Sequence, residues 1–189
     1  MALHTSRLGY KKKPFLSKEK KRLRNLIGTR NLQGVRNHYL SGNFPKIWEV
    51  YEGEGLNYDS SLGWSTRLGY RAKTSNPFQP LNLTSGQPFK LVEFPLIFMD
   101  TAVEDNGVEY IYNECKFFID QAETDRSVLT ILWHTDRVCN PEYTNFSEAY
   151  LRILELLSKR RFVSKTCSEV CEMYQDHVKK LNSNLQING

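Results

Sequence analysis

Val128-Leu-Thr-Ile-Leu-Trp133 is an apolar run that gives the strongest strand signal in the chain. Residues 110–122 before it and 146–159 after it repeat apolar side chains at helical spacing. A second apolar run over residues 91–99 contains Pro95, which predicts a bulge or an edge strand. Buried strands that alternate with helices favour a parallel sheet with helices outside it.

The same alternation continues on both sides of this region. We expect further strands over residues 2–3, 32–36, 56–58 and 162–163 and further helices over 17–28, 44–54 and 166–181. Ser17 is the predicted N-cap and Gly28 the stop of the first helix, and Thr166 with Glu169 forms a capping box for the last. We treat residues 1–181 as one domain and 182–189 as a frayed polar tail.

A complete (β/α) barrel needs about 200–250 residues, and this chain has 189. The sheet is therefore either open or lacks some of its units. The composition, with 40% hydrophobic and 25% charged residues, is that of an ordinary globular protein. There is no signal peptide or membrane-spanning run, so the chain as written is expected to be cytoplasmic, provided that Met1 is the true start.

Positive charge is concentrated at the N-terminus. Residues 1–30 contain ten Lys and Arg against Glu19 alone, a local charge of +9, while the other 159 residues sum to −4. Such a segment can attract nucleic acid or anionic surfaces, but it also fits the solvated face of a helix. The four cysteines form no C-x-x-C pair, and Cys167 and Cys171 fit half-buried helix thiols better than a metal site with His177.

Polar residues occur at several predicted strand ends, where parallel α/β folds collect their functional groups. The positions in chain order are His4, Arg36, His38, Tyr39, Asp59, Asp100 and His134. The long segment over residues 60–90 is rich in Gly, Ser, Asn and Pro, and loops of this length are usually functional or disordered. Its aromatic and basic residues, among them Trp64, Tyr70 and Arg71, argue against simple disorder.

Five motifs occur in an order that resembles a bacterial branch of the polysaccharide deacetylase family. They are Gly34-Val-Arg-Asn-His-Tyr-Leu40, Tyr58-Asp-Ser-Ser-Leu-Gly63, Gly69-Tyr-Arg-Ala-Lys-Thr-Ser-Asn-Pro-Phe78, Glu93-Phe-Pro-Leu-Ile-Phe-Met-Asp100 and Leu129-Thr-Ile-Leu-Trp-His134. The resemblance covers residues 2–175. It implies an α/β fold of the polysaccharide deacetylase type, a partial, distorted (β/α) barrel with mostly parallel strands that lacks the N-terminal β/α units.

The resemblance also implies a reaction. Members of the family hydrolyse N-acetyl groups of amino-sugar polymers through a water on a divalent metal, usually zinc. By its motif His134 is similar to the catalytic acid, Arg36 to the arginine that orients a catalytic aspartate, and Asp59 to an acidic partner of that arginine. His4 is similar to the first histidine of the metal motif. The expected ligand is an N-acetylated glycan, and the residues expected to bind it are Tyr39, Trp64, Tyr70, Arg71 and Trp133.

The chain also departs from the family pattern. Leu8 stands where the second metal histidine is usual, and His38 from the next strand end is the candidate to replace it. The family's Thr-Phe-Asp-Asp segment would precede His4, and no Asp-Asp pair occurs anywhere in the chain. We therefore expect a truncated protein that is inactive alone and that pairs with a missing N-terminal half or with itself.

Two alternatives stay open. The chain could be a non-catalytic carbohydrate-binding remnant that stacks sugars on Trp64, Tyr70 and Trp133, although core or loop-anchoring aromatics would look the same in the sequence. It could instead bind nucleic acid through the basic segment over residues 7–30, which would require binding that falls steeply with salt.

Overall fold

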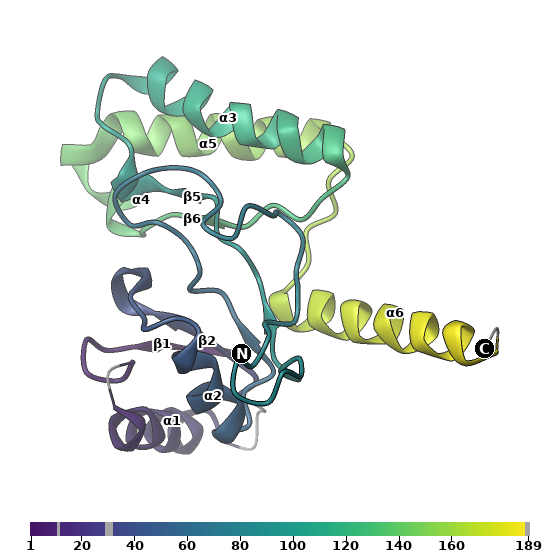
Figure 1. The fold of residues 1–189 in the computed structure, drawn as a ribbon. Coiled ribbons are helices and arrows are strands. Elements are labelled where there is room, and N and C mark those ends of the chain that lie inside the picture. Colours follow the sequence, from purple (N-terminus) through teal and green to yellow (C-terminus); the bar gives the residue numbers. More distant parts are fainter. Residues whose placement is uncertain (11, 29–31, 188–189) are drawn as a thin grey trace. The chain divides into compact units, whose positions relative to one another are not determined.

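The computed structural model describes residues 1–10, 12–28 and 32–187. It is an α/β protein whose paired strands are parallel (Figure 1). The chain forms two compact units. Unit 1 comprises residues 1–61, 77–93 and 164–189, and unit 2 comprises residues 62–76 and 94–163.

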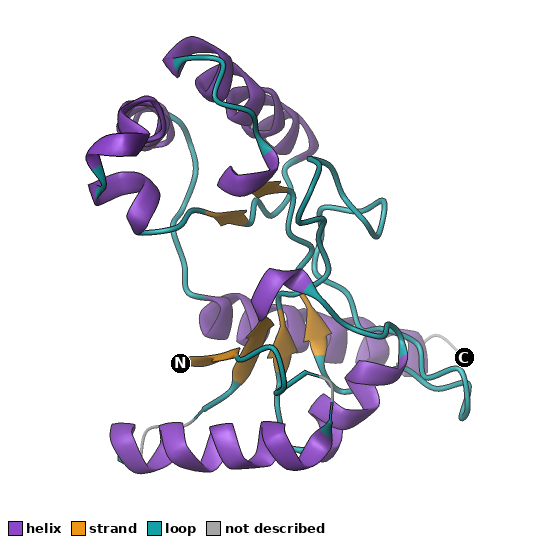
Figure 2. Ribbon diagram, turned by 90° about the vertical axis from the view of Figure 1, so that its left-hand side faces the viewer, coloured by secondary structure: helices purple, strands orange, loops and turns teal. Residues whose placement is uncertain are grey.

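Unit 1 contains a four-stranded parallel sheet whose spatial order follows the sequence (Figure 2). The strands are β1 (Ala2–Thr5), β2 (Gly34–Asn37), β3 (Tyr58–Asp59) and β4 (Val92–Glu93). Leu3, Val35 and Val92 are buried apolar residues of this sheet. Because all four strands are parallel, their C-terminal ends meet at one edge, as predicted.

Gly34 is required by the pairing of β2 with β3. It lies opposite Tyr58 in the register, and a Cβ atom at this glycine would come within 2.0 Å of the Tyr58 ring. The ring therefore covers the position where a side chain would stand. The two strands can pack in this way only because residue 34 has no side chain.

Among the described residues, unit 1 also contains the helices α1 (Lys13–Ile27), α2 (Lys46–Gly53) and α6 (Cys167–Ile187). The predicted cap of α1 at Ser17 is wrong, because the helix begins one turn earlier with Lys12 at the N-cap and Pro14 in its first turn. Gly28 ends the helix with φ 69°, as predicted. The Thr166–Glu169 capping box is confirmed by bonds in both directions between these two residues.

Unit 2 pairs β5 (Phe98–Met99) with β6 (Ile131–Leu132) and adds α3 (Val108–Asp125), the short α4 (Asp136–Cys139) and α5 (Thr144–Lys159). Helices α3 and α5 lie side by side (Figure 1). Their buried residues recur at helical spacing, namely Ile111, Cys115 and Ile119 on α3 and Phe146, Ala149 and Ile153 on α5. These two stripes form the core of unit 2 together with Ile97 and Phe98.

Other differences from the predicted elements are local. The predicted strand over 91–99 is interrupted around Pro95, so its two ends become β4 and β5 in different sheets. Residues 162–163 form no strand, and the predicted polar tail is helical to Ile187. Single 3-10 turns occupy His38–Leu40, Asp100–Ala102 and Pro141–Tyr143. None of the helices in the described part of the chain is long and apolar enough to cross a bilayer.

Candidate functional sites

The first candidate site lies at the C-terminal edge of the unit 1 sheet, where two histidines meet. His4, in β1, stands opposite Arg36 of β2, and His38 directly follows β2. The Nε2 atom of His4 lies 3.2 Å from Nδ1 of His38. The other ring nitrogen of His4, Nδ1, lies 3.1 Å from the carbonyl oxygen of Arg36. The parallel pairing of β1 and β2 thus brings together the two predicted metal ligands.

This arrangement fits two positions of a divalent-metal site. Two nitrogens that each bind a tetrahedral zinc at its usual distance are about 3.3 Å apart, close to the 3.2 Å observed between the two rings. If Nδ1–H of His4 donates to the Arg36 carbonyl, Nε2 presents a lone pair, as in most metal-bound histidines. However, no group of three or more His, Cys, Asp or Glu suited to a metal occurs among the described residues.

The segment after His38 has an uncommon backbone conformation. Tyr39 and Leu40 both have positive φ, 58° and 52°, although neither is glycine. The Tyr39 side chain is 47% exposed, its ring lies 4.3 Å from the His38 ring, and its hydroxyl accepts a hydrogen bond from Arg7. Two consecutive residues in this region are a local strain of the kind found at functional sites.

Arg36, the predicted orienting residue, is half-buried at this edge. Its Nε donates to the Ser60 hydroxyl at 3.0 Å. Burial lowers the pKa of Arg36, while Cys167, Asp59 and Glu93 oppose that shift. Arg36 therefore interacts with Asp59 in two ways: the negative charge of Asp59 attracts the guanidinium, and Arg36 is hydrogen-bonded to Ser60, the residue next to Asp59.

Asp59 is fully buried and belongs to an acidic pair. It stands opposite Glu93 in the β3–β4 register, and the indole Nε1–H of Trp48 donates to both carboxyl groups, at 3.2 Å and 3.0 Å respectively. The backbone N–H of Ser61 also donates to Asp59, at 3.0 Å. Burial raises the pKa of Asp59 to about 6, despite these hydrogen bonds. Because Asp59 is buried and accepts hydrogen bonds from Trp48 and Ser61, its role here is structural: it holds these residues in place at the sheet edge.

The second candidate site lies in unit 2 and centres on His134. Its Nδ1 lies 2.6 Å from Oδ1 of Asp100, and its backbone N–H donates to Oδ2 at 2.9 Å. Asp100 is fully buried, whereas 40% of the His134 side chain is exposed, and Arg137 Nε approaches Oδ2 to 3.8 Å. A histidine that is oriented by a buried carboxylate and exposed to solvent is suited to proton transfer.

Trp133 belongs to the core of unit 2. Its ring stacks on Phe98 at 5.6 Å and also contacts Phe146 and Tyr150. Its buried Nε1 has no hydrogen-bond partner in the described part of the chain. This packing favours the core interpretation of Trp133 over sugar stacking.

The predicted substrate-binding residues of the long loop lie together in unit 2. Arg67 and Arg71 place their guanidinium carbons 3.8 Å and 4.9 Å from the centre of the Trp64 ring. Tyr70 is half-buried and packs against the core of unit 2, and burial raises its pKa. Because Arg67 stacks on the indole, the ring is less available as a simple platform for sugars.

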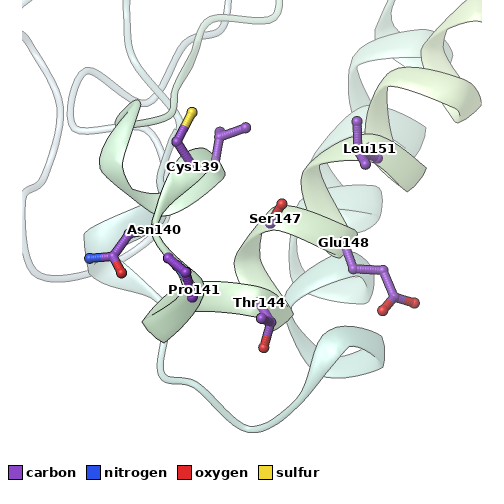
Figure 3. Close-up of a pocket in the computed structure, with 8 residues that line it drawn as sticks. Cys139, Asn140, Pro141, Thr144, Ser147, Glu148 and Leu151 are labelled. Carbon is purple, nitrogen blue, oxygen red and sulfur yellow. The ribbon is translucent and has the colours of Figure 1, made fainter.

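Two open hollows lie elsewhere. One, of about 420 Å³, lies between α4 with its following 3-10 turn and the first half of α5, and Cys139, Ser147 and Leu151 contribute to its wall (Figure 3). The other, of about 470 Å³, is bordered in unit 1 by Glu49, Glu52 and the loop around Asn82. Neither hollow is lined by a residue that the sequence singled out as a site residue.

The sequence assigned no role to Asp100 and did not single out Glu93 or Trp48 as site residues. Asp100 could have been found from its position directly after β5, had the parallel pairing of β5 with the strand before His134 been known. Glu93 and Trp48 carry no such signal, because their roles depend on contacts across 34 and 11 residues of sequence with Asp59.

The two clusters and the strand topology define an α/β protein with mostly parallel strands. Comparison with protein-family models, curated proteins and solved structures gave no match for this chain.

Proposed function

We propose that this chain is a polysaccharide deacetylase-like protein of the distorted (β/α) barrel type, which binds N-acetylated glycans and holds a divalent metal, preferably zinc, on His4 and His38. The observation that carries the proposal is the 3.2 Å approach of His4 Nε2 to His38 Nδ1. The bond of the opposite His4 nitrogen to the Arg36 carbonyl supports it, because metal-binding imidazoles are usually held in this way.

The Asp100–His134 pair supports the second part of the reaction. Hydrolysis of an amide requires a group that protonates the leaving amine, and His134 is held by the buried Asp100 with part of its ring exposed. We assign His134 as the proton donor and Asp100 as the positioning residue. Arg36 positions the sheet edge beside the histidine pair through Ser60.

We expect the chain as given to bind metal and glycan without turnover. When bound, a divalent metal would acidify a water and polarise the acetyl carbonyl. The chain has no Asp-Asp pair, and the described residues add no third ligand to the two histidines. The set of metal ligands that the family resemblance implies is thus incomplete, and the aspartate base that it implies is missing from this chain.

Zinc titration of the purified chain by calorimetry tests the metal assignment. His4→Ala and His38→Ala should each weaken zinc binding at least about tenfold, since one of two nitrogen ligands is lost. His177→Ala is the matched control, because His177 is an exposed histidine on α6 that does not belong to the pair. Equal zinc affinity in all four proteins would remove the histidine pair from the proposal.

Calorimetry with chitin oligomers tests glycan recognition separately. Binding without release of acetate is the expected result. Release of acetate would show that the chain turns over substrate despite the missing pair. No binding at any oligomer length would remove the glycan part of the proposal.

One observation favours a second candidate function, the binding of nucleic acid by α1. Lys20 is buried and pairs with Glu54 at 3.5 Å, and the only acidic residue of the helix, Glu19, accepts from Ser6. The exposed cations of this region are Lys12, Lys13, Lys18, Lys21, Arg22 and Arg24. Within the described residues these six make no ion pair, which leaves a cationic face toward solvent.

Salt dependence tests this second function. If α1 binds phosphates, the affinity for a labelled single-stranded oligonucleotide should fall at least about tenfold between 50 and 200 mM salt. Joint replacement of Lys18, Lys21 and Arg22 by alanine should reduce both the affinity and the salt slope. Lys179→Ala with Lys180→Ala on α6 is the control, and an isotherm that does not change with salt would exclude this function.

A further inference from the structure

Residues 62–76 of unit 2, here called the cationic loop, concentrate positive charge around one indole. The loop contains Arg67, Arg71 and Lys73 and no acidic residue. The guanidinium carbons of Arg67 and Arg71 lie 3.8 Å and 4.9 Å from the centre of the same Trp64 ring. The two cations are therefore at most 8.7 Å apart, the sum of these two distances.

The cationic loop is fixed to unit 2 at its middle. Leu68 and Tyr70 pack against the hydrophobic core, and the N–H of Gly69 between them donates to the Ile97 carbonyl at 3.1 Å. The N–H of Lys73 closes a turn onto the Tyr70 carbonyl at 3.3 Å. These contacts hold the backbone that carries Trp64, Arg67 and Arg71. The loop therefore loses little conformational entropy when a ligand binds.

The positive charge of Arg67 is not neutralised by an ion pair with a neighbouring carboxylate among the described residues. Arg67 is exposed, and no carboxylate among the described residues lies within ion-pair distance of it. Burial and the charge of Asp125 both raise the pKa of the Tyr70 hydroxyl. Two guanidinium groups near one ring repel each other, and an oxyanion that binds to both would relieve this repulsion.

The chemistry of the stacked arginine fits such a ligand. A guanidinium that lies over an aromatic ring keeps its N–H donors at its edge, where they can meet the two oxygens of a carboxylate or phosphate in parallel. The indole holds the guanidinium plane in place through the cation–π contact. Arg67 is thus prepared to bind an oxyanion through two parallel hydrogen bonds.

We infer that the cationic loop is a subsite for an oxyanion carried on the glycan, so that this protein selects acidic glycans over neutral ones through Arg67 and Arg71 on Trp64. This inference rests on the proposed glycan-binding function and names the class of glycan. The oxyanion can be the carboxylate of a uronic acid or a phosphate ester on the sugar, and the two share the same recognition by guanidinium.

Calorimetry on the 189-residue chain tests the inference with three probes of similar length, namely a hyaluronan hexasaccharide, a phosphorylated chitin hexasaccharide and neutral chitohexaose. At least one acidic probe should bind about tenfold or more tightly than chitohexaose, and the tighter acidic probe identifies the oxyanion. Arg67→Ala and Arg67→Lys should each remove most of this preference, because lysine keeps the charge but lacks the planar fork.

Arg161→Ala is the matched control, since it removes one exposed positive charge from the same unit. Equal binding of the acidic and neutral probes would overturn the inference while leaving glycan binding in place. An equal loss in the Arg67→Ala and Arg161→Ala variants would also overturn it, because general charge would then explain the preference. If no glycan binds, the proposed function fails and this inference fails with it. If an oligonucleotide binds with the same dependence on Arg67, the loop is a nucleic-acid site instead.

Discussion

His134 makes two contacts with the carboxyl group of Asp100, its ring Nδ1 at 2.6 Å from Oδ1 and its backbone N–H donating to Oδ2 at 2.9 Å. Strand pairing produces this geometry. Met99 of β5 is in register with Leu132 of β6, so the residues that leave the two strands emerge next to each other. A third bond, from the Thr101 N–H at 2.9 Å, completes the shell of Oδ1.

Asp100→Asn should destabilise the protein by about 1–3 kcal/mol, because an asparagine amide group would face one of these donors with a donor of its own. The free energy of unfolding from urea titration measures the effect. Asp136→Asn, at an exposed position of α4, is the matched control and should change stability by less than about 0.5 kcal/mol. Equal stability of the two variants would show that Asp100 does not hold His134 in this way.

The same pair shows what could be predicted from the sequence. Strand ends are local features, and the apolar runs before Asp100 and His134 identified both residues as strand-end positions. Their contact depends on which strands pair, and pairing is set by packing between segments 34 residues apart. The run over residues 91–99 looked like one strand, yet its interruption around Pro95 gives Glu93 to unit 1 and Asp100 to unit 2.

The helix ends could be predicted from the sequence where the residues that form them are close together in the chain. Gly28 marks a real helix end through its own positive φ of 69°. The Thr166–Glu169 pair marks another, because its hydrogen bonds lie within the first turn of the helix. Ser17 has the right residue type for a cap, but its hydroxyl donates to the Lys13 carbonyl inside α1. Pro14, preorganised for the first turn, starts the helix earlier than the pattern of apolar residues suggests.

Thr166→Ala should destabilise α6 by about 1 kcal/mol, because the N–H of Glu169 loses the hydroxyl oxygen that accepts it at 3.3 Å. Thr166→Ser keeps the acceptor and should retain most of the stability. Thermal unfolding followed by circular dichroism measures both. Ser183→Ala, which removes a hydroxyl that donates to the carbonyls of Lys179 and Lys180 within the helix, is a control with little expected effect.

Gly34→Ala should destabilise unit 1 by about 1–3 kcal/mol, since the added methyl group would displace the Tyr58 ring from the sheet. Gly53→Ala is the opposite case. Gly53 is the last residue of α2, and a Cβ there would lie 3.7 Å from the Lys13 amine in ordinary contact. Alanine should therefore be neutral or stabilise by up to about 1 kcal/mol. Chemical denaturation measures the stability of both variants. If Gly34→Ala and Gly53→Ala changed stability equally, the tight packing of β2 against β3 at Gly34 would be contradicted.

The buried Asp59 makes stability depend on pH in a defined direction. Burial raises its pKa from 3.8 to about 6, so the folded state binds a proton more tightly than the unfolded state does. The stabilisation is therefore complete below about pH 4 and is lost as the pH rises through 6. A shift of this size corresponds to about 3 kcal/mol between the two limits.

Urea titrations between pH 4 and 7.5 should show this loss in the unmodified chain, and Asp59→Asn should flatten the curve across the same interval. The single amide oxygen of asparagine can accept from Ser61 or from Trp48 but not from both, and the amide cannot ionise. The variant therefore loses one hydrogen bond at every pH and loses the titration. Asp125→Asn, at an exposed end of α3, should leave the slope unchanged. A slope in the Asp59→Asn variant as steep as in the unmodified chain would assign the titration to another group, and Glu93→Gln would then test the partner in the acidic pair.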